Sequence, residues 1–341
     1  MIPRVAITLG DPAGVGPEVV VKALALPEVR AACAPVVVGD EATLREAAAR
    51  LGARLDVEVV DETSLPRRAR RPGHPTVEGG RAAYRSIETA ARLATSDAVD
   101  AIVTAPINKE WVTRAGFPIS GHTELLRELT GAADVRMMLA GERLRVVLVT
   151  MHVALAAVPR ALTIDNVART IRIADDHLRR YHGLPRPRLA VAGLNPHAGE
   201  GGLFGDEERR IIAPAVRRAR RAGANVSGPH AADSLFFRAV AGEFDAVIAM
   251  YHDQGLIPLK LLHFHDGVNV TMGLPIVRTS PDHGTAYDIA GTGTADPGSM
   301  VAALLLAARM ATSRRDAKPA RAGAAAVPRA RLTGTRRRHA R

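Results

Sequence analysis

Short apolar runs alternate with longer segments in which apolar positions recur every three to four residues. The apolar runs fall at 5–9, 36–38, 101–105, 145–151, 188–194, 246–250 and 268–272. They are continuous, which is typical of strands buried on both faces of a sheet. Helical spacing is clearest at 78–94, and further helices are expected at 164–181 and 206–221. Strands that alternate with helices in this way predict an α/β fold with a largely parallel sheet.

Histidines follow three of the predicted strands. His152, His197 and His252 each come just after an apolar run, and ligands of open α/β sheets bind beyond the carboxyl ends of strands. A single histidine in such a place is more often a hydrogen-bonded structural residue. Three in equivalent places favour a site for a divalent metal such as Zn²⁺, Co²⁺ or Mn²⁺, with coordination positions left for substrate. Asp253 and Glu200 are either orienting residues for these histidines or ordinary loop acids.

Polar residues elsewhere allow two interpretations. In SGHTELL, Thr123 is either the N-cap of a helix, or it joins Gly121 and His122 as a donor aimed at an anion. Lys260, Asn269 and Arg278 are each expected in or beside a β-like segment. The two cations there would either clamp a phosphate or carboxylate or lie on the surface.

Two glycine-rich loops differ in what they indicate. GDPAGVGPE, residues 10–18, follows a strand and opens a helix but lacks the Gly-Lys-Ser/Thr of a phosphate loop, so we interpret it as a tight turn. DHGTAYDIAGTG, residues 282–293, resembles the adenosine-binding loop of the isopropylmalate and isocitrate dehydrogenases, with Tyr287 in place of the usual proline. Asp288 can accept from a ribose 2′-hydroxyl and would repel a 2′-phosphate, which favours NAD over NADP. The residues that this resemblance assigns to the cofactor are Gly284, Thr285, Ala286, Asp288, Ile289 and Gly291.

Charge is distributed unevenly along the chain. The net charge is +11, but residues 313–341 hold ten Lys/Arg and one Asp, a net of +9, which leaves +2 for residues 1–312. We therefore expect a basic, disordered tail at 313–341 on an ordinary globular core, which argues against a nucleic-acid-binding protein. The single cysteine, Cys33, excludes an intramolecular disulfide and fits a cytoplasmic protein. No signal peptide is expected at the start, and no apolar run is long enough to span a membrane.

Seven ordered blocks of the chain resemble the 4-hydroxythreonine-4-phosphate dehydrogenase family of pyridoxine (vitamin B6) biosynthesis. The blocks are GDPAGVGPE, TAPINKE, GHTE, LNPHAGEGGLFGDEE, GPHAADSLF, YHDQGLIPLK and VNVTMGLPIVRTSPDHGTAYDIAGTG. The resemblance implies a two-lobed fold like that of isocitrate and isopropylmalate dehydrogenase, with the active site in the cleft between the lobes. The implied cofactor lobe is 1–120 plus 285–312. The implied lobe for substrate, metal and dimerisation is 121–284.

The resemblance also implies a reaction. It is the oxidation of 4-phosphooxy-L-threonine by NAD, with one divalent metal ion (Zn, Co, Mn or Mg) per site, to 2-amino-3-oxo-4-phosphooxybutanoate. This product decarboxylates to 3-amino-2-oxopropyl phosphate. His152, His197 and His252 would hold the metal. The substrate would be bound by His122, Thr123, Lys260, Asn269 and Arg278, in a homodimer whose subunits share the active site.

Four points remain open from the sequence: the catalytic base and three alternative functions. The catalytic base could be Lys260, Asp233 or a water held by Asp253. A sister dehydrogenase of the same scaffold would act on 4-phospho-threonate, 4-phospho-erythronate or a related β-hydroxy acid. A phosphotransferase that uses GDPAGVGPE, or a polyanion-binding protein that uses the basic tail, would be of another class altogether.

Overall fold

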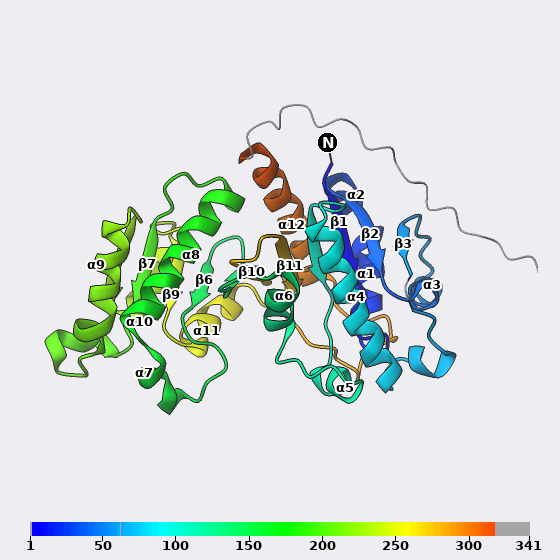
Figure 1. The fold of residues 1–341 in the computed structure, drawn as a ribbon, viewed down its shortest axis with the longest axis horizontal. Helices are drawn as coiled ribbons and strands as arrows, with labels where there is room; N and C mark the ends of the chain where they lie inside the picture. The colour runs from blue at the N-terminus through cyan, green and yellow to red at the C-terminus, as the bar shows by residue number, and fades with distance from the viewer. Residues whose placement is uncertain (1, 62, 318–341) are drawn as a thin grey trace, which may run out of the picture.

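The computed structural model describes residues 2–61 and 63–317. Within them a single eleven-stranded sheet runs in the order β3-β2-β1-β4-β11-β10-β5-β6-β9-β7-β8 (Figure 1). The strands are β1 (Arg4–Thr8), β2 (Ala34–Val38), β3 (Glu58–Val60), β4 (Ala101–Thr104), β5 (Arg136–Ala140), β6 (Arg145–Leu148), β7 (Leu189–Ala192), β8 (Val226–His230), β9 (Ala246–Ala249), β10 (Val268–Met272) and β11 (Val277–Pro281).

Strand direction divides this sheet into two parallel groups. Seven of the ten strand pairs in the described residues are parallel. The antiparallel pairs are β11–β10, β10–β5 and β5–β6. The group that ends in β4 and β11 therefore runs opposite to the group that begins with β6. The predicted α/β fold with a largely parallel sheet is confirmed, with an antiparallel seam in the middle.

Helices cover both faces of the sheet. They are α1 (Gly16–Ala25), α2 (Pro27–Ala32), α3 (Glu41–Arg50), α4 (Val77–Thr95), α5 (Lys109–Arg114), α6 (His122–Thr130), α7 (Val158–Ala161), α8 (Ile164–His182), α9 (Ala213–Arg221), α10 (Ala232–Val240), α11 (His252–Leu262) and α12 (Gly298–Ala317). Shorter turns are η1 (Arg67–Arg70), η2 (Leu155–Ala157), η3 (Pro196–Gly202) and η4 (Glu208–Ile212). One core packs α1, α8, α9 and α12 against the sheet. On the other face, α4 and α6 form a second core, and α10 and α11 a third.

Local signals explain where the longer helices begin and end. Thr76 caps α4 by accepting from the amide of Gly79, and Thr163 caps α8 by accepting from the amide of Asn166. Helix α8 ends at Gly183, whose φ of 65° is left-handed and suits glycine. Both helices match the predicted segments to within a residue or two.

Each of the seven apolar runs forms a strand, and four further strands lie outside these runs; one of them, β11, contains Arg278, which was expected in or beside a β-like segment. Strands β3, β5, β8 and β11 carry polar or mixed sequences, and β11 (VRTSP) is buried throughout. The expectation that Lys260 lies in or beside a β-like segment is wrong. Lys260 is on α11, which begins right after β9 and continues through Pro258.

The carboxyl-terminal helix extends beyond the predicted core. Helix α12 continues to Ala317. Arg315 pairs with Asp100, the residue just before β4, and its Nε lies 2.9 Å from Oδ1 of Asp100. The first five residues of the predicted tail are thus helical, and the rest of it lies outside the described residues. The predicted division into lobes stays a prediction, because the sheet runs through both parts without a break.

A search of the described residues for a helix long and apolar enough to cross a membrane finds none. The cytoplasmic location expected from the cysteine content stays a prediction. Cys33 itself is a buried thiol, and burial raises its pKa to about 11.

Candidate active site

A cavity of about 390 Å³ lies over the antiparallel seam of the sheet. Its floor comes from β4, β11, β10 and β5, on which Asn269 and Thr271, like Arg278 and Ser280, are two residues apart and so share a face. The lining residues are Thr104, Pro106, Ile107, Lys109, Ser120, Gly121, His122, Thr123, Glu124, Met137, Met151, His152, Lys260, Asn269, Arg278, Ser280, Pro281, Asp282, His283 and Gly284. All five predicted substrate-binding residues are among them.

Arg278 is a buried cation at the floor of this cavity. Its side chain is 2% exposed and donates to the hydroxyls of Thr104 (2.7 Å) and Thr271 (2.9 Å). Burial lowers the pKa of Arg278 from 12.5 to about 9, against the opposing charge of Glu124. A guanidinium that bonds to hydroxyls in place of a carboxylate keeps its charge available for an anion.

The amino-terminal end of α6 opens onto the same cavity. The helix begins at His122 with Gly121 as its N-cap, and no side-chain cap bond to its first amides is found in the described part of the chain. The interpretation of Thr123 as the N-cap is therefore wrong; its hydroxyl lies 3.5 Å from that of Thr271. Free amides and the helix dipole make this end attractive to an anion.

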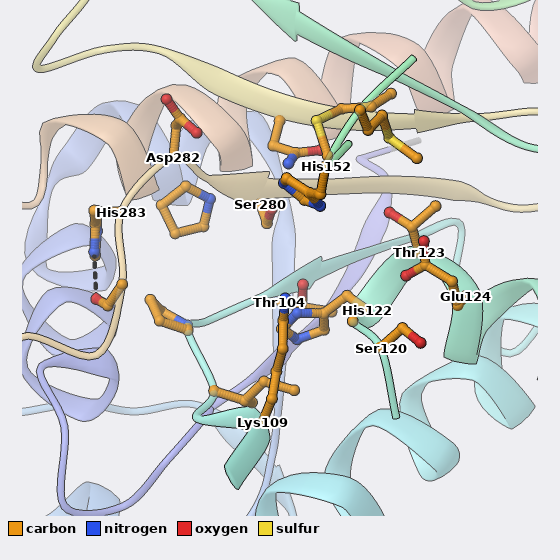
Figure 2. Close-up of a pocket in the computed structure, with 18 of the residues that line it drawn as sticks. Thr104, Lys109, Ser120, His122, Thr123, Glu124, His152, Ser280, Asp282 and His283 are labelled. Carbon is orange, nitrogen blue, oxygen red and sulfur yellow. Dashed lines mark hydrogen bonds between the residues drawn. The ribbon is translucent and has the colours of Figure 1, made fainter. Parts of the chain in front are cut away.

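His122 is a neutral imidazole in this wall. Burial, with the positive charges of Arg278 and Lys109, lowers the pKa of His122 well below 6.5. Its Nε2 is buried and lacks a hydrogen-bond partner among the described residues. In Figure 2, His122 and Lys109 lie on one side of the cavity and His152 on the other. An unsatisfied imidazole nitrogen in a pocket wall points to a polar ligand.

Lys260 reaches the cavity from α11. Its Nζ lies 3.1 Å from Oδ2 of Asp282, at the end of β11. The other two candidate bases do not line the cavity. Asp233 bonds to the amide of Ser234 on α10, and Asp253 bonds to His252.

Two of the three predicted metal histidines lie together. His152 follows β6 and His252 begins α11 after the neighbouring strand β9, and their ring centroids are 5.7 Å apart. Oδ1 of Asp253 lies 2.7 Å from Nδ1 of His252. This contact orients the ring and leaves Nε2 for a metal, which fits the orienting role expected for Asp253.

His197 is held elsewhere, on the loop after β7. The strand order β6-β9-β7 puts all three histidines at one sheet edge, as expected. However, no group of three or more His, Cys, Asp or Glu side chains with metal-site spacing occurs in residues 2–61 and 63–317. His197 lies instead near Phe204, with ring centroids 6.2 Å apart. A single chain therefore brings together two of the three proposed ligands.

The loop that carries His197 is strained and anchored. Residues 197–201 all have positive φ, including His197 (52°), Ala198 (53°) and Glu200 (40°), which L side chains rarely adopt. Glu208 is buried and accepts from the amides of Leu194 and Asn195, both at 2.7 Å. Strain of this kind persists where the surroundings fix it and is concentrated at functional sites.

The expected cofactor loop borders the cavity on the β11 side. Gly284 lines the cavity, while Thr285, Ala286, Asp288, Ile289 and Gly291 continue away from it. Asp288 and Ile289 are exposed. The loop packs on GDPAGVGPE, where a Cβ at Gly14 would lie 2.9 Å from the carbonyl oxygen of Thr285. Residues 10–18 thus form a turn that packs closely on this loop at Gly14, which fits the tight turn interpreted from the sequence.

Several lining residues were missed by sequence reasoning. Lys109, Glu124, Asp282 and His283 all lie within the blocks quoted above, but nothing in their spacing indicates which of them faces the cavity. His283 bonds to the carbonyl oxygen of Gly284 through Nδ1, at 3.0 Å (Figure 2), and its Nε2 is buried without a partner in the described part of the chain.

Comparison with known proteins gives consistent results. A family described as pyridoxal phosphate biosynthetic protein PdxA matches residues 31–307. The chain is 56% identical over 325 residues to a 4-hydroxythreonine-4-phosphate dehydrogenase of Geobacter metallireducens, which covers 91% of this chain and 96% of that protein. It is 45% identical over 324 residues to a D-threonate 4-phosphate dehydrogenase of Pectobacterium atrosepticum, with 90% and 99% covered. A crystal structure of 4-hydroxythreonine-4-phosphate dehydrogenase from Klebsiella pneumoniae matches with a TM-score of 0.84 at 46% identity, covering 91% of this chain and 98% of that one.

Proposed function

Because the chain belongs to the PdxA family of dehydrogenases, we propose that it oxidises 4-phosphooxy-L-threonine with NAD and a divalent metal ion. The observation that carries this proposal is the cavity itself. Anion-binding groups line one part of it, and His152, whose ring lies 5.7 Å from that of His252, lines another. A small substrate with a phosphate at one end and a hydroxyl near its middle would satisfy both.

The phosphate and the carboxylate would be held by the cationic groups. Arg278 supplies a fixed fork from the floor, and the first turn of α6 supplies backbone amides. Lys109 lines the same cavity and has no ion-pair partner among the described residues. These three donors allow both acidic ends of the substrate to be bound without burying an unpaired charge.

The set of metal ligands would be completed by a second copy of the chain. His152 and His252 fit one ion as a pair, and His197 lies on an anchored, exposed loop. Large apolar side chains are exposed beside all three histidine segments, at Val153, Leu155, Leu203, Phe204, Phe237, Ile257, Leu261, Leu262 and Phe264. Leu261 is 84% exposed and Leu203 is 74% exposed, which is unfavourable in water unless a surface covers them. We therefore propose a homodimer in which the partner's His197 joins His152 and His252.

The chemistry would then be divided between the bound groups and the chain. When bound, the metal lowers the pKa of the substrate hydroxyl, and NAD⁺ accepts the hydride. Lys260 is proposed to accept the hydroxyl proton as the neutral amine, which becomes the ammonium, since it is the one candidate base that lines the cavity. Asp282, 3.1 Å from Nζ, would then pair with the ammonium that forms. The β-keto acid that results loses CO₂ readily, and the neutral His122 is positioned to donate to a developing oxyanion.

The alternative substrate is D-threonate 4-phosphate, which relatives of 45–47% identity are named for. It has a neutral hydroxyl where 4-phosphooxy-L-threonine has a cationic amine. Glu124 and Asp282 add two carboxylates to the cavity wall, which favours the amine.

The test is NADH formation from each substrate by the metal-loaded protein. The proposal predicts a kcat/KM for 4-phosphooxy-L-threonine that is about tenfold or more above that for D-threonate 4-phosphate. Equal or reversed values would assign the alternative function, and no NADH from either would reject both. Truncation after Ala317 is expected to leave NADH formation intact, which distinguishes the dehydrogenase from a polyanion-binding protein.

A further inference from the structure

Glu18 is a buried carboxylate that binds a distant loop. It lies in the first turn of α1 and is 4% exposed. Its Oε2 accepts from the amides of Gly291 and Gly293, each at 3.2 Å, and its Oε1 accepts from the amide of Ala295 at 3.0 Å. None of these three backbone donors belongs to α1 itself. Glu18 therefore fixes residues 291–295 to the first turn of α1.

Lys22 holds the same segment by its carbonyl groups. One helical turn after Glu18, its Nζ donates to the carbonyl oxygens of Gly293 (2.8 Å) and Ala295 (2.6 Å). It also lies 3.0 Å from Oε1 of Glu18. We call the two residues the Glu18–Lys22 clamp. Between them they bond to both donors and acceptors of the loop, which fixes its orientation as well as its position.

The other end of the loop is tied to the same turn. The amide of Val15 donates to the carbonyl oxygen of Thr285 at 2.9 Å, and the hydroxyl of Tyr287 donates to Oδ2 of Asp11 at 2.7 Å. Between these ties and the clamp lie Asp288 and Ile289, both exposed. Asp288 and Ile289, which are expected to contact the cofactor, are therefore accessible to a ligand, while the segments on either side of them are fixed to residues 11–22.

We propose that Glu18 and Lys22 are positioning residues for the cofactor, which keep residues 285–295 in the shape that binds NAD before NAD arrives. This inference rests on the proposed function, because it takes residues 284–291 as the cofactor loop. A loop ordered in advance loses less conformational freedom on binding, so its affinity is higher. The clamp does not line the substrate cavity. Changes to the clamp should therefore weaken cofactor binding and leave substrate binding unchanged.

The experiment compares Glu18→Gln and Lys22→Met with the wild-type protein. Gln is isosteric, but its side-chain NH₂ group cannot accept a hydrogen bond, so at least one backbone amide loses its acceptor. We expect the Kd for NADH, measured by fluorescence titration without substrate, to rise about tenfold in each variant. The KM for NAD should rise in parallel, while kcat and the KM for the phosphorylated substrate stay within about threefold. Hydrogen exchange at Gly291, Gly293 and Ala295 should be faster in the cofactor-free variants.

Glu208→Gln is the matched control. Glu208 is also buried and also accepts from two backbone amides, but in the loop that carries His197. Its replacement should leave the Kd for NADH unchanged. Unaltered NADH binding by both clamp variants would overturn the inference, as would an equal loss in Glu208→Gln. If the wild-type protein bound no NADH, the proposed function would fail too, and if Glu18→Gln did not fold, Lys22→Met would decide alone.

Discussion

Replacing Arg278 by methionine should stabilise the protein and disable it. Burial lowers the pKa of Arg278 from 12.5 to about 9, yet an arginine stays protonated at neutral pH. At about 1.4 kcal/mol for each tenfold change in proton affinity, the empty site keeps this charge at a cost of about 5 kcal/mol. Methionine removes the charge, but it leaves the hydroxyls of Thr104 and Thr271 without their donor, a loss of about 1–3 kcal/mol.

The net expectation is a free energy of unfolding about 2–4 kcal/mol higher, or a rise of about 3–6 °C in Tm. In the same variant, kcat/KM for the phosphorylated substrate should fall about 100-fold or more, because the buried anion loses its cation. Thermal denaturation with and without substrate measures both effects. The Tm of the wild-type protein should rise when substrate is added, and the Tm of Arg278→Met should not. Arg278→Lys keeps a cation, so its Tm should show part of the rise. An Arg278→Met protein that melts below wild type and still gains Tm with substrate would refute the reasoning.

Three further outcomes follow from other parts of the molecule. Burial lowers the pKa of His177 well below 6.5 and that of His182 to about 3. Below pH 6.5 the unfolded state alone takes up these protons, so the free energy of unfolding should fall by up to about 1.4 kcal/mol per pH unit for each histidine. Urea denaturation at pH 7 and 5 measures this fall, and His177→Leu should reduce it; an unchanged difference would contradict the assignment. Leu126→Ala on α6 should cost about 2–5 kcal/mol in the same assay, because Leu126 is fully buried; a loss below about 1 kcal/mol would show that the site collapses around the smaller side chain. Chelation should abolish NADH formation and one added divalent metal should restore it; turnover that survives complete removal of metal would exclude a metal-dependent reaction.

The strands and helices that were predicted share one property, which is a strong local pattern. Apolar runs such as 246–250 and the helical spacing of 78–94 need no tertiary information, and both formed as expected. Strand β11 is not an apolar run, and the sequence indicated it only by the β-like segment expected near Arg278. Its sequence VRTSP is mostly polar. Its polar side chains are satisfied inside the protein, because Arg278 donates to the hydroxyl of Thr271 in the seam and Thr279 donates to the carbonyl oxygen of Ala303 on α12. Polar residues are buried in this part of the sheet because they form the site, and the spacing of apolar residues along the sequence does not predict this.

The candidate site was predicted by residue type but not by geometry. The strand-end rule brought three histidines to one edge, yet it could not show that they form no three-residue metal group within the described part of one chain. Nor could it assign Lys260 to a helix, since Pro258 reads as a helix breaker and yet lies inside α11. The Glu18–Lys22 clamp joins residues more than 270 positions apart, and no local pattern reports such contacts.

Complementation between two inactive variants tests the shared active site most directly. His152→Ala and His197→Ala proteins should each lack activity, because every site in either homodimer misses one ligand. If the partner's His197 completes each site, a mixed dimer has one site with all three histidines. Mixing the two after dissociation should then restore about a quarter of wild-type NADH formation, since about half of the dimers are mixed and each has one intact site. A mixture as inactive as its components, with mixed dimers demonstrably formed, would contradict the account.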